Sequence, residues 1–326
     1  MNKDEFLNRL TEQLPQLKQS DIDQLTEYYQ ELICDGLEQG RTEENIIAGF
    51  GRPEDIAGQI KNEYKEYTQI LTPPKTEQNR QDYTTQTPIT KIFVEAQNLR
   101  IEIRQVPSGT VRVLFQPREG VDEVIHTVDH GEFIFRHRMR MFPLNIANWF
   151  RFPQRVILEI PENFHGSMRV KTSNSQINAT SLPKMSDVQL ITCNAKITAE
   201  NMSADTMLLQ TSNGGLLLRN LNGRRLEAIT CNDRVNAANC SFPDTLLLST
   251  KNGSISLQDI IGDNIVLTTC NSSITGNILG DMRDYGIESK TSNSSNNLPN
   301  YQYPDQRKHL KAKTSNGRIM VEFRIP

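Results

Sequence analysis

The stretch Thr211-Ser212-Asn213-Gly214-Gly215-Leu216 decides the fold of this chain, because similar turns recur along it at near-constant spacing. The shared pattern is Thr-x-Asn, and in seven of eight cases an apolar residue stands three positions after the Asn. It occurs at Thr172-Ser-Asn174, Thr192-Cys-Asn194, Thr211-Ser-Asn213, Thr230-Cys-Asn232, Thr250-Lys-Asn252, Thr269-Cys-Asn271, Thr291-Ser-Asn293 and Thr314-Ser-Asn316. The Asn residues are 20, 19, 19, 20, 19, 22 and 23 residues apart. Such self-similarity is typical of a solenoid, in which each coil stacks on the one before it.

The composition of the repeat predicts which side chains face the core. Side chains alternate along a strand, and the residue between Thr and Asn includes Lys251, so we expect this middle position to point outward and Thr and Asn inward. Each Asn amide can then bond to the equivalent amide one coil away, which predicts a structural ladder of Asn174, Asn194, Asn213, Asn232, Asn252, Asn271, Asn293 and Asn316. Asn and the following Gly214, Gly253 and Gly317 also tolerate the left-handed backbone that we expect at this corner.

The fold class that follows is mainly β, with one small all-α bundle. Residues 89–326 are predicted to form a single-stranded β-solenoid of about 19–20 residues per coil, and we expect a right-handed coil. Residues 89–160 would supply leading strands and a cap, and residues 161–326 the eight Asn-turn repeats. Residues 1–68 have the apolar periodicity of short helices, whereas residues 69–88 are polar and contain three prolines, as in a linker.

Composition excludes several classes of protein. Residues 1–68 hold seven basic and 15 acidic residues, a net charge of −8, which leaves +5 for the remainder; neither value favours nucleic-acid binding. Five cysteines without a CxxC pair argue against a disulfide framework and a zinc site, and we expect no metal and no cofactor. We see no secretory signal in Met1 to Leu14 and no apolar run of transmembrane length, so a cytoplasmic location is expected, either free or peripheral to the inner face of the membrane.

Two resemblances cover most of the chain. The segments Phe6-Leu7, Tyr28-Tyr29 and Phe50-Gly51-Arg52-Pro53, with the apolar positions between them, resemble the bacterial HAAS helical signalling domain. The iterated Thr-x-Asn-Gly-x-Ile pattern, preceded by Val156-Ile-Leu-Glu-Ile-Pro161, resembles the adhesin-type β-strand-repeat domain of Gram-positive bacteria. The first resemblance implies signalling beneath a membrane, and the second implies a link to envelope-stress responses. Neither implies a catalytic residue.

The segment from Phe133 to Leu158 is unusual because it contains no acid and interleaves arginines with large apolar residues. Such a mixture suits an anionic lipid surface or a partner protein, and the candidate contact residues are Arg136, Arg138, Arg140, Trp149, Phe150 and Arg151. The same segment could instead cap the open end of the solenoid, which is the favoured interpretation.

The sequence gives little support for a catalytic site. Glycan-active β-helix enzymes need carboxylates clustered on neighbouring coils, whereas the aligned outward column of turn residues holds only Ser, Cys and Lys. His126 and His130 have helical metal-ligand spacing in a segment that looks like strand and loop.

The sequence therefore predicts a non-enzymatic binding or sensing protein of a membrane-associated signalling or envelope-stress system. A protein partner is expected at the acidic helices, with an anionic membrane surface as a further candidate. The alternatives are a surface adhesin or glycan-binding solenoid and, disfavoured, a glycan-active β-helix enzyme.

Overall fold

The computed structural model describes residues 1–17, 19–38, 40–58, 60–61, 81–107, 109–118, 122–139, 155–300 and 306–325. The chain divides into two compact units. The helical unit comprises Met1–Arg80, Gln116–Glu123 and Arg138–Gln154, and the solenoid unit comprises Gln81–Phe115, Val124–His137 and Arg155–Pro326.

The helical unit contains α1 (Lys3–Glu12), α2 (Gln19–Glu38) and α3 (Glu43–Phe50), and residues 53–58 and 60–61 are also helical. Asn2 and Thr42 begin α1 and α3 as N-caps, because their side-chain oxygens accept hydrogen bonds from backbone N–H groups three residues on. The core of this unit is centred on three rings. Phe6 lies 5.1 Å from Tyr29 and 5.5 Å from Phe50, measured between ring centroids. Burial raises the pKa of the Tyr29 hydroxyl.

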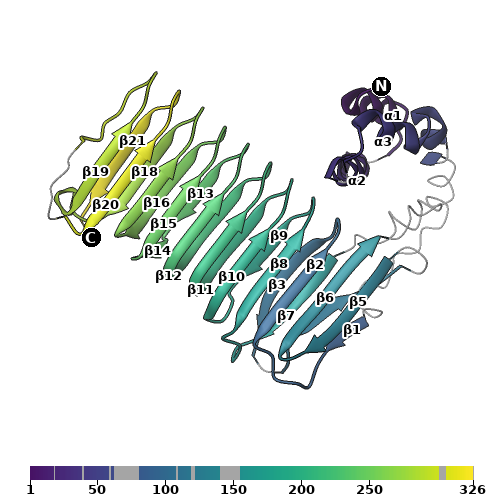
Figure 1. Cartoon of the computed structure of the whole chain (residues 1–326), viewed down its shortest axis with the longest axis horizontal. Coiled ribbons are helices and arrows are strands. Elements are labelled where there is room, and N and C mark those ends of the chain that lie inside the picture. Colours follow the sequence, from purple (N-terminus) through teal and green to yellow (C-terminus); the bar gives the residue numbers. More distant parts are fainter. Residues whose placement is uncertain are drawn as a thin grey trace. The chain divides into compact units, whose positions relative to one another are not determined.

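The solenoid unit consists mainly of strands (Figure 1), with one short 3-10 helix among its described residues. The strands are β1 (Gln81–Thr84), β2 (Lys91–Ala96), β3 (Arg100–Val106), β4 (Arg112–Phe115), β5 (Asp122–Asp129), β6 (Glu132–Met139), β7 (Arg155–Pro161), β8 (Ser167–Thr172), β9 (Ile177–Thr180), β10 (Met185–Ile191), β11 (Ile197–Gln210), β12 (Leu216–Ile229), β13 (Val235–Ala238), β14 (Ser241–Phe242), β15 (Thr245–Ser249), β16 (Ile255–Gly262), β17 (Asn264–Thr268), β18 (Ile274–Leu279), β19 (Tyr285–Lys290), β20 (Lys308–Lys313) and β21 (Ile319–Arg324). The 3-10 helix covers Met282–Asp284.

Most of the strands form two walls, and the short β14 pairs instead with the middle of β12 and the end of β16. The A wall contains, in spatial order, β6, β2, β8, β10, the second halves of β11 and β12, β15, β17, β20 and β19, and every neighbouring pair in it is parallel. The B wall contains β1, β4, β7, β3, β9, the first halves of β11 and β12, β13, β16, β18 and β21. Its pairs are parallel from β7 onward. Parallel pairing between successive passes of one chain is the architecture of a β-solenoid, as predicted.

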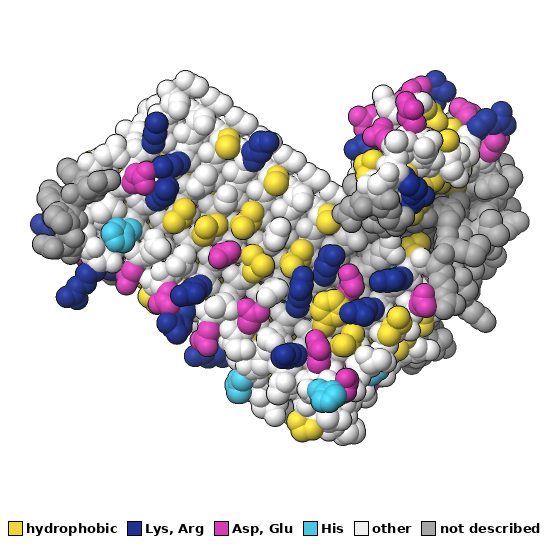
Figure 2. All heavy atoms as spheres, in the orientation of Figure 1, with side chains coloured by type: hydrophobic (Ala, Val, Ile, Leu, Met, Phe, Trp, Pro, Cys, Tyr) yellow, Lys and Arg dark blue, Asp and Glu magenta, His cyan; other side chains and the backbone are white. Residues whose placement is uncertain are grey.

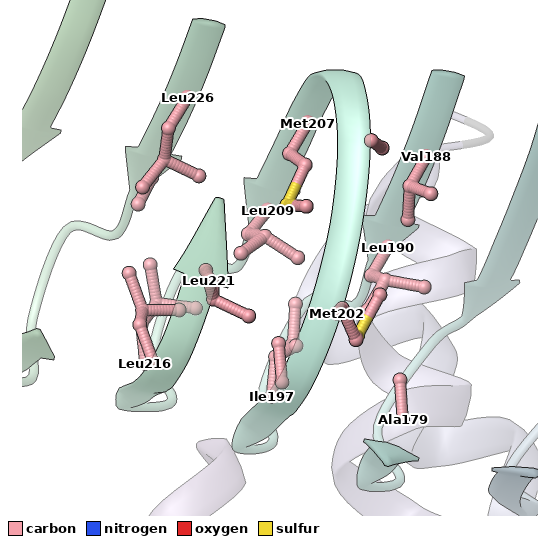
Figure 3. Close-up of a cluster of buried hydrophobic side chains, with 14 of the residues drawn as sticks. Ala179, Val188, Leu190, Ile197, Met202, Met207, Leu209, Leu216, Leu221 and Leu226 are labelled. Carbon is pink, nitrogen blue, oxygen red and sulfur yellow. The ribbon is translucent and has the colours of Figure 1, made fainter. Parts of the chain in front are cut away.

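The inward side chains of the two walls form one continuous core (Figure 3). Val188, Leu190, Met207 and Leu209 from the A wall meet residues such as Leu216 from the B wall, and all are at most 3% exposed. The apolar residues that stand three positions after the Asn in seven of the turns therefore face the core as predicted, and each coil shares its core with its neighbours.

Coils at both ends do not stack in sequence order, which corrects our expectation of consecutive stacking. At the C-terminal end β20 pairs with β17 on one side and β19 on the other, so the last strand of this wall in the sequence is second to last in space. At the N-terminal end β2 lies between β6 and β8, and β3 lies between β7 and β9. The strands nearest the C-terminus thus have neighbours on both sides, which limits fraying.

The Thr and Asn residues of the turn behave differently, which corrects a second expectation. The Thr side chains at seven of the turns are at most 6% exposed, and Thr230, for example, donates a hydrogen bond of 2.8 Å to the carbonyl of Gly214 in the preceding coil. The Asn amides do bond from coil to coil, for example at 2.6 Å between Asn252 and Asn232, but from Asn213 onward they are exposed. The ladder also runs in spatial order, since Asn316 donates to Asn271 and Asn293 donates to Asn316.

Left-handed residues occur at the opposite corner of the coil. Asn201, Asn220, Asn239 and Asp259 have φ between 52° and 54°, whereas the Asn residues of the Thr-x-Asn turns are absent from the positive-φ residues of the described chain. The glycines that follow the Asn in some Thr-x-Asn turns are needed for a reason other than a positive φ. A Cβ on Gly214 would lie 1.9 Å from the carbonyl oxygen of the preceding coil, so the backbones approach too closely for a side chain.

The N-terminal end of the solenoid is antiparallel. β1 pairs with β4, and β4 pairs with β7, both antiparallel. A two-residue turn joins β5 to β6, and both its residues, His130 and Gly131, have positive φ as a type I′ hairpin requires. Residues 81–84 of the predicted linker therefore belong to a strand, because tertiary pairing with β4 orders a segment that has no apolar period of its own.

Candidate functional site

The outward side chains of the A wall lie in rows that run across the coils. One row passes from Ile134 and Phe93 through Arg169, and a neighbouring row contains Arg136, Glu95 and Lys171. The parallel register brings equivalent positions of successive strands side by side, about 4.8 Å apart. Residues distant in the sequence therefore make one surface.

An apolar stripe crosses the middle of this wall. Its members are Ile191 on β10, Leu208 on β11, Ile229 on β12, Leu247 on β15 and Val266 on β17. Each is partly exposed and points outward between buried neighbours. Leu247 stands directly opposite Val266 and the others are diagonal neighbours, so the stripe is a zigzag without interruption. Figure 2 shows hydrophobic side chains along the middle of this face, with charged side chains on either side.

A basic corner lies at the N-terminal end of the A wall, on β6, β2 and β8. The Arg136 guanidinium lies 5.1 Å from the centroid of the Phe93 ring, within cation–π range. Glu95 is shared between Arg136 at 3.8 Å and Lys171 at 3.7 Å, so one carboxylate faces two cations. The outward basic residues here are Lys91, Arg136, Arg138, Arg169 and Lys171, and the outward acids are Glu95 and Glu132. Positive charge is therefore in excess.

A second basic corner lies at the C-terminal end, on β20 and β19. Glu288 faces Lys311 at 3.5 Å and Lys313 at 2.6 Å, and these bonds lower the pKa of the Glu288 carboxyl. Lys290 stands directly opposite Lys313, and among the described residues it has no ion-pair partner. Basic outward residues again outnumber acidic ones. The A wall therefore carries an apolar centre between two basic ends.

Comparison with protein families identifies both parts of the chain. The model of the Toastrack DUF4097 family matches residues 89–324, which is most of the chain. The chain belongs to this Toastrack family. The HAAS model matches residues 5–59 in the helical unit. Both resemblances predicted from the sequence are thereby confirmed.

Other comparisons add little to the Toastrack assignment. A crystal structure of a "putative cell adhesion protein" from Clostridium sporogenes ATCC 15579 is similar with 8% identity and a TM-score of 0.23, over 76% of this chain and 100% of that chain. No curated protein matches the sequence. Within the described residues, no helix is long and apolar enough to span a membrane.

The two ends of the predicted contact segment, Phe133 to Leu158, lie on strands of the Toastrack domain. Phe133 and Phe135 on β6 and Leu158 on β7 are fully buried, so the described ends of Phe133 to Leu158 are strands of the two walls, and the cap interpretation stays a prediction for the segment. Arg136 and Arg138 are exposed on β6. The remaining candidates lie outside the described residues: Arg140, Trp149, Phe150 and Arg151.

The two histidines considered as metal ligands, His126 and His130, have different surroundings in the Toastrack domain. His126 points from β5 towards the rings of Tyr83 and Phe133, at 5.7 Å and 4.9 Å, and burial lowers its pKa, whereas the neighbouring His130 is exposed in the hairpin turn. No cluster of three or more His, Cys, Asp or Glu occurs among the residues that the structure describes.

The sequence interpretation missed the apolar stripe. Its signal was present in runs such as Met207-Leu208-Leu209 and Leu246-Leu247-Leu248. In a strand with alternating faces, three consecutive apolar residues must place one outward.

Proposed function

We propose that this chain is a non-enzymatic binding and sensing component of a membrane-associated signalling system, and that the A wall of its Toastrack domain binds an anionic membrane surface. The apolar stripe between two basic ends carries this proposal. Partly exposed aliphatic side chains enter the interface of a bilayer, while Lys and Arg near the surface interact with lipid phosphates. The HAAS match supports the signalling part, and the net charge of −8 over residues 1–68 supports a contact with a protein partner there.

The dimensions of the wall favour an extended partner. The A wall has ten strands, β6 to β19 in spatial order. At a strand spacing of about 4.8 Å its length is roughly 43 Å. The stripe consists of single aliphatic residues, one on each strand, rather than an aromatic anchor of the kind that dominates protein interfaces. A flat anionic membrane surface can contact the whole length of the A wall.

Charge argues against a second copy as the occupant. Two A walls placed face to face in an antiparallel arrangement would bring Arg136 and Lys171 of one copy to Lys290 and Lys313 of the other. A parallel arrangement would oppose each basic end to itself. Both leave like charges facing each other, whereas an anionic membrane attracts both ends.

Co-sedimentation of the full chain with anionic and neutral vesicles tests this function. We expect binding to vesicles of phosphatidylserine and phosphatidylcholine that weakens with salt, and no binding to phosphatidylcholine alone. Arg169 and Lys290 have no ion-pair partner among the described residues, so replacing both with Gln removes two outward charges and little else. At about 1 kcal/mol per charge the double variant should bind about 30-fold more weakly.

The stripe provides a second arm with a matched control. Leu208→Gln together with Leu247→Gln places amides in the middle of the A wall and should also weaken binding. Leu217→Gln makes the same change at a partly exposed outward position of the B wall and should leave binding unchanged. Equal loss in the B-wall variant, or equal binding to neutral vesicles, would show that the A wall is not the membrane surface.

A further inference from the structure

Two opposite charges stand on β12 in the middle of the apolar stripe. Glu227 faces outward two residues before Ile229, and its direct neighbours on β11 and β15 are Leu208 and Leu247. Arg225 lies on the same face of the strand, two residues before Glu227. At about 3.3 Å per residue, the Cα atoms of the two charged residues are about 7 Å apart. An acid and a base therefore lie side by side at the centre of the A wall.

Neither charge is used within the described part of the chain. Both side chains are exposed, and among the described residues neither makes an ion pair or a hydrogen bond. Glu95 and Glu288 differ in this respect, because each is within 4.0 Å of two cations. These two acids at the basic ends of the wall thus serve internal ion pairs, whereas Glu227 is available to a ligand.

Contact with a membrane changes the surroundings of Glu227. This step rests on the proposed function: if the apolar stripe enters the bilayer interface, Leu208 and Leu247 bring the carboxylate with them. An ionised carboxylate that loses water without gaining a partner is costly. The diagonal outward neighbours on β11 and β15 are all neutral: Thr206, Gln210, Thr245 and Ser249. Since lipid phosphates attract Arg225, the membrane itself must supply a cation to Glu227.

We propose that Arg225 and Glu227 together bind the headgroup of phosphatidylethanolamine in the membrane. This headgroup is zwitterionic, with a phosphate diester joined through two carbon atoms to a primary ammonium. The Arg225 guanidinium donates hydrogen bonds to the phosphate, and the Glu227 carboxylate accepts hydrogen bonds from the ammonium. Phosphatidylcholine carries the same charges, but its quaternary ammonium has no N–H to donate. The pair therefore selects among zwitterionic lipids, whereas the basic ends of the wall attract anionic ones.

Vesicles that differ only in their zwitterionic lipid test this inference. All contain the same fraction of phosphatidylserine, so the surface charge is constant, and the remainder is phosphatidylcholine with or without phosphatidylethanolamine. In co-sedimentation, the full chain should bind about fivefold more tightly when phosphatidylethanolamine is present, as expected for one charged contact at a membrane surface. Arg225→Gln should weaken binding to both kinds of vesicle about fivefold, because both lipids carry the phosphate.

Variants of Glu227 separate headgroup binding from other effects of the lipid. Glu227→Gln should abolish the preference for phosphatidylethanolamine, and Glu227→Asp, which keeps the carboxylate, should retain it. The control Glu322→Gln makes the same change at an exposed outward position of β21 on the B wall and should leave the preference unchanged. All these positions are exposed, so the variants should unfold at the wild-type urea concentration.

The outcomes distinguish this inference from the proposed function. A preference that survives in Glu227→Gln would be due to lipid packing and would overturn the inference. Equal binding of the wild type to both kinds of anionic vesicle would overturn it as well, and would leave the proposed function standing. Absence of binding to every anionic vesicle would overturn both.

Discussion

Replacing Gly253 with Ala tests the close approach of neighbouring coils. The added Cβ would lie 1.9 Å from the carbonyl oxygen of Asp233 and 2.2 Å from its carbon. Both are backbone atoms, so no side-chain rotation relieves the overlap, and an ordinary contact begins at about 3.4 Å. The coils must separate locally, which stretches the hydrogen bond of 2.8 Å from the Asn252 N–H to the preceding coil.

The expected cost follows from these contacts. Overpacking that shifts the backbone costs about 1–3 kcal/mol, and one weakened hydrogen bond adds about 1 kcal/mol. Reduced entropy of the unfolded chain returns about 0.4–1 kcal/mol. We therefore expect Gly253→Ala to lower the free energy of unfolding by about 1–3.5 kcal/mol, measured from urea unfolding of the full chain by circular dichroism.

The matched control lies at the same position of the next coil. Ser272 already carries a Cβ there, so Ser272→Ala should change the free energy of unfolding by less than about 0.5 kcal/mol. Unchanged stability of Gly253→Ala would refute the argument, because it would mean that the coils separate there at no cost.

Three further predictions concern the same unit. Burial alone would raise the pKa of Glu159, but hydrogen bonds from its two arginine partners lower this pKa below 4.5. The ionised Glu159 therefore stabilises the folded protein at neutral pH, and this stabilisation is lost as the pH falls below 4.5. Glu159→Gln should remove part of this acid dependence of the urea midpoint. Asn232→Ala removes two ladder bonds of 2.5 and 2.6 Å and should cost about 1–2 kcal/mol in the same assay, whereas Ser212→Ala at an outward turn position should cost less than about 0.5 kcal/mol. Deleting residues 307–326 removes β20, which lies between β17 and β19, together with β21, so hydrogen exchange should accelerate in β17 and β19; protection equal to that of the full chain would contradict the observed pairing.

The solenoid could be predicted from the sequence because its turn recurs at a near-constant period. The direction of the side chains could not be predicted correctly where the alternation of a strand stops. Thr230 and Asn232 were both assigned inward by counting in twos through the turn. The backbone at the turn is not a strand, so the count fails there, and only Thr is buried. The strand β1 was missed because four residues carry too little pattern, and its order comes from the contact of Tyr83 with distant rings.

The exchanged order of the C-terminal coils has a signature in the turns. From the second turn onward, Cys-Asn with a following non-glycine alternates with x-Asn-Gly: Cys193-Asn-Ala, Ser212-Asn-Gly, Cys231-Asn-Asp, Lys251-Asn-Gly and Cys270-Asn-Ser. The next turn in the sequence, at Asn293, lacks the expected glycine, whereas the last turn, Asn316-Gly317, has it. Gly317 lies against the carbonyl of Ser272, so in space the alternation continues without a break. Each turn with a glycine after its Asn packs against a turn that has a side chain at that position. A neighbour with a glycine is therefore favoured beside the turn of Cys270, and the last coil has this glycine whereas the seventh does not. The alternation is therefore a steric rule between adjacent coils, and it identifies neighbours that sequence order alone does not.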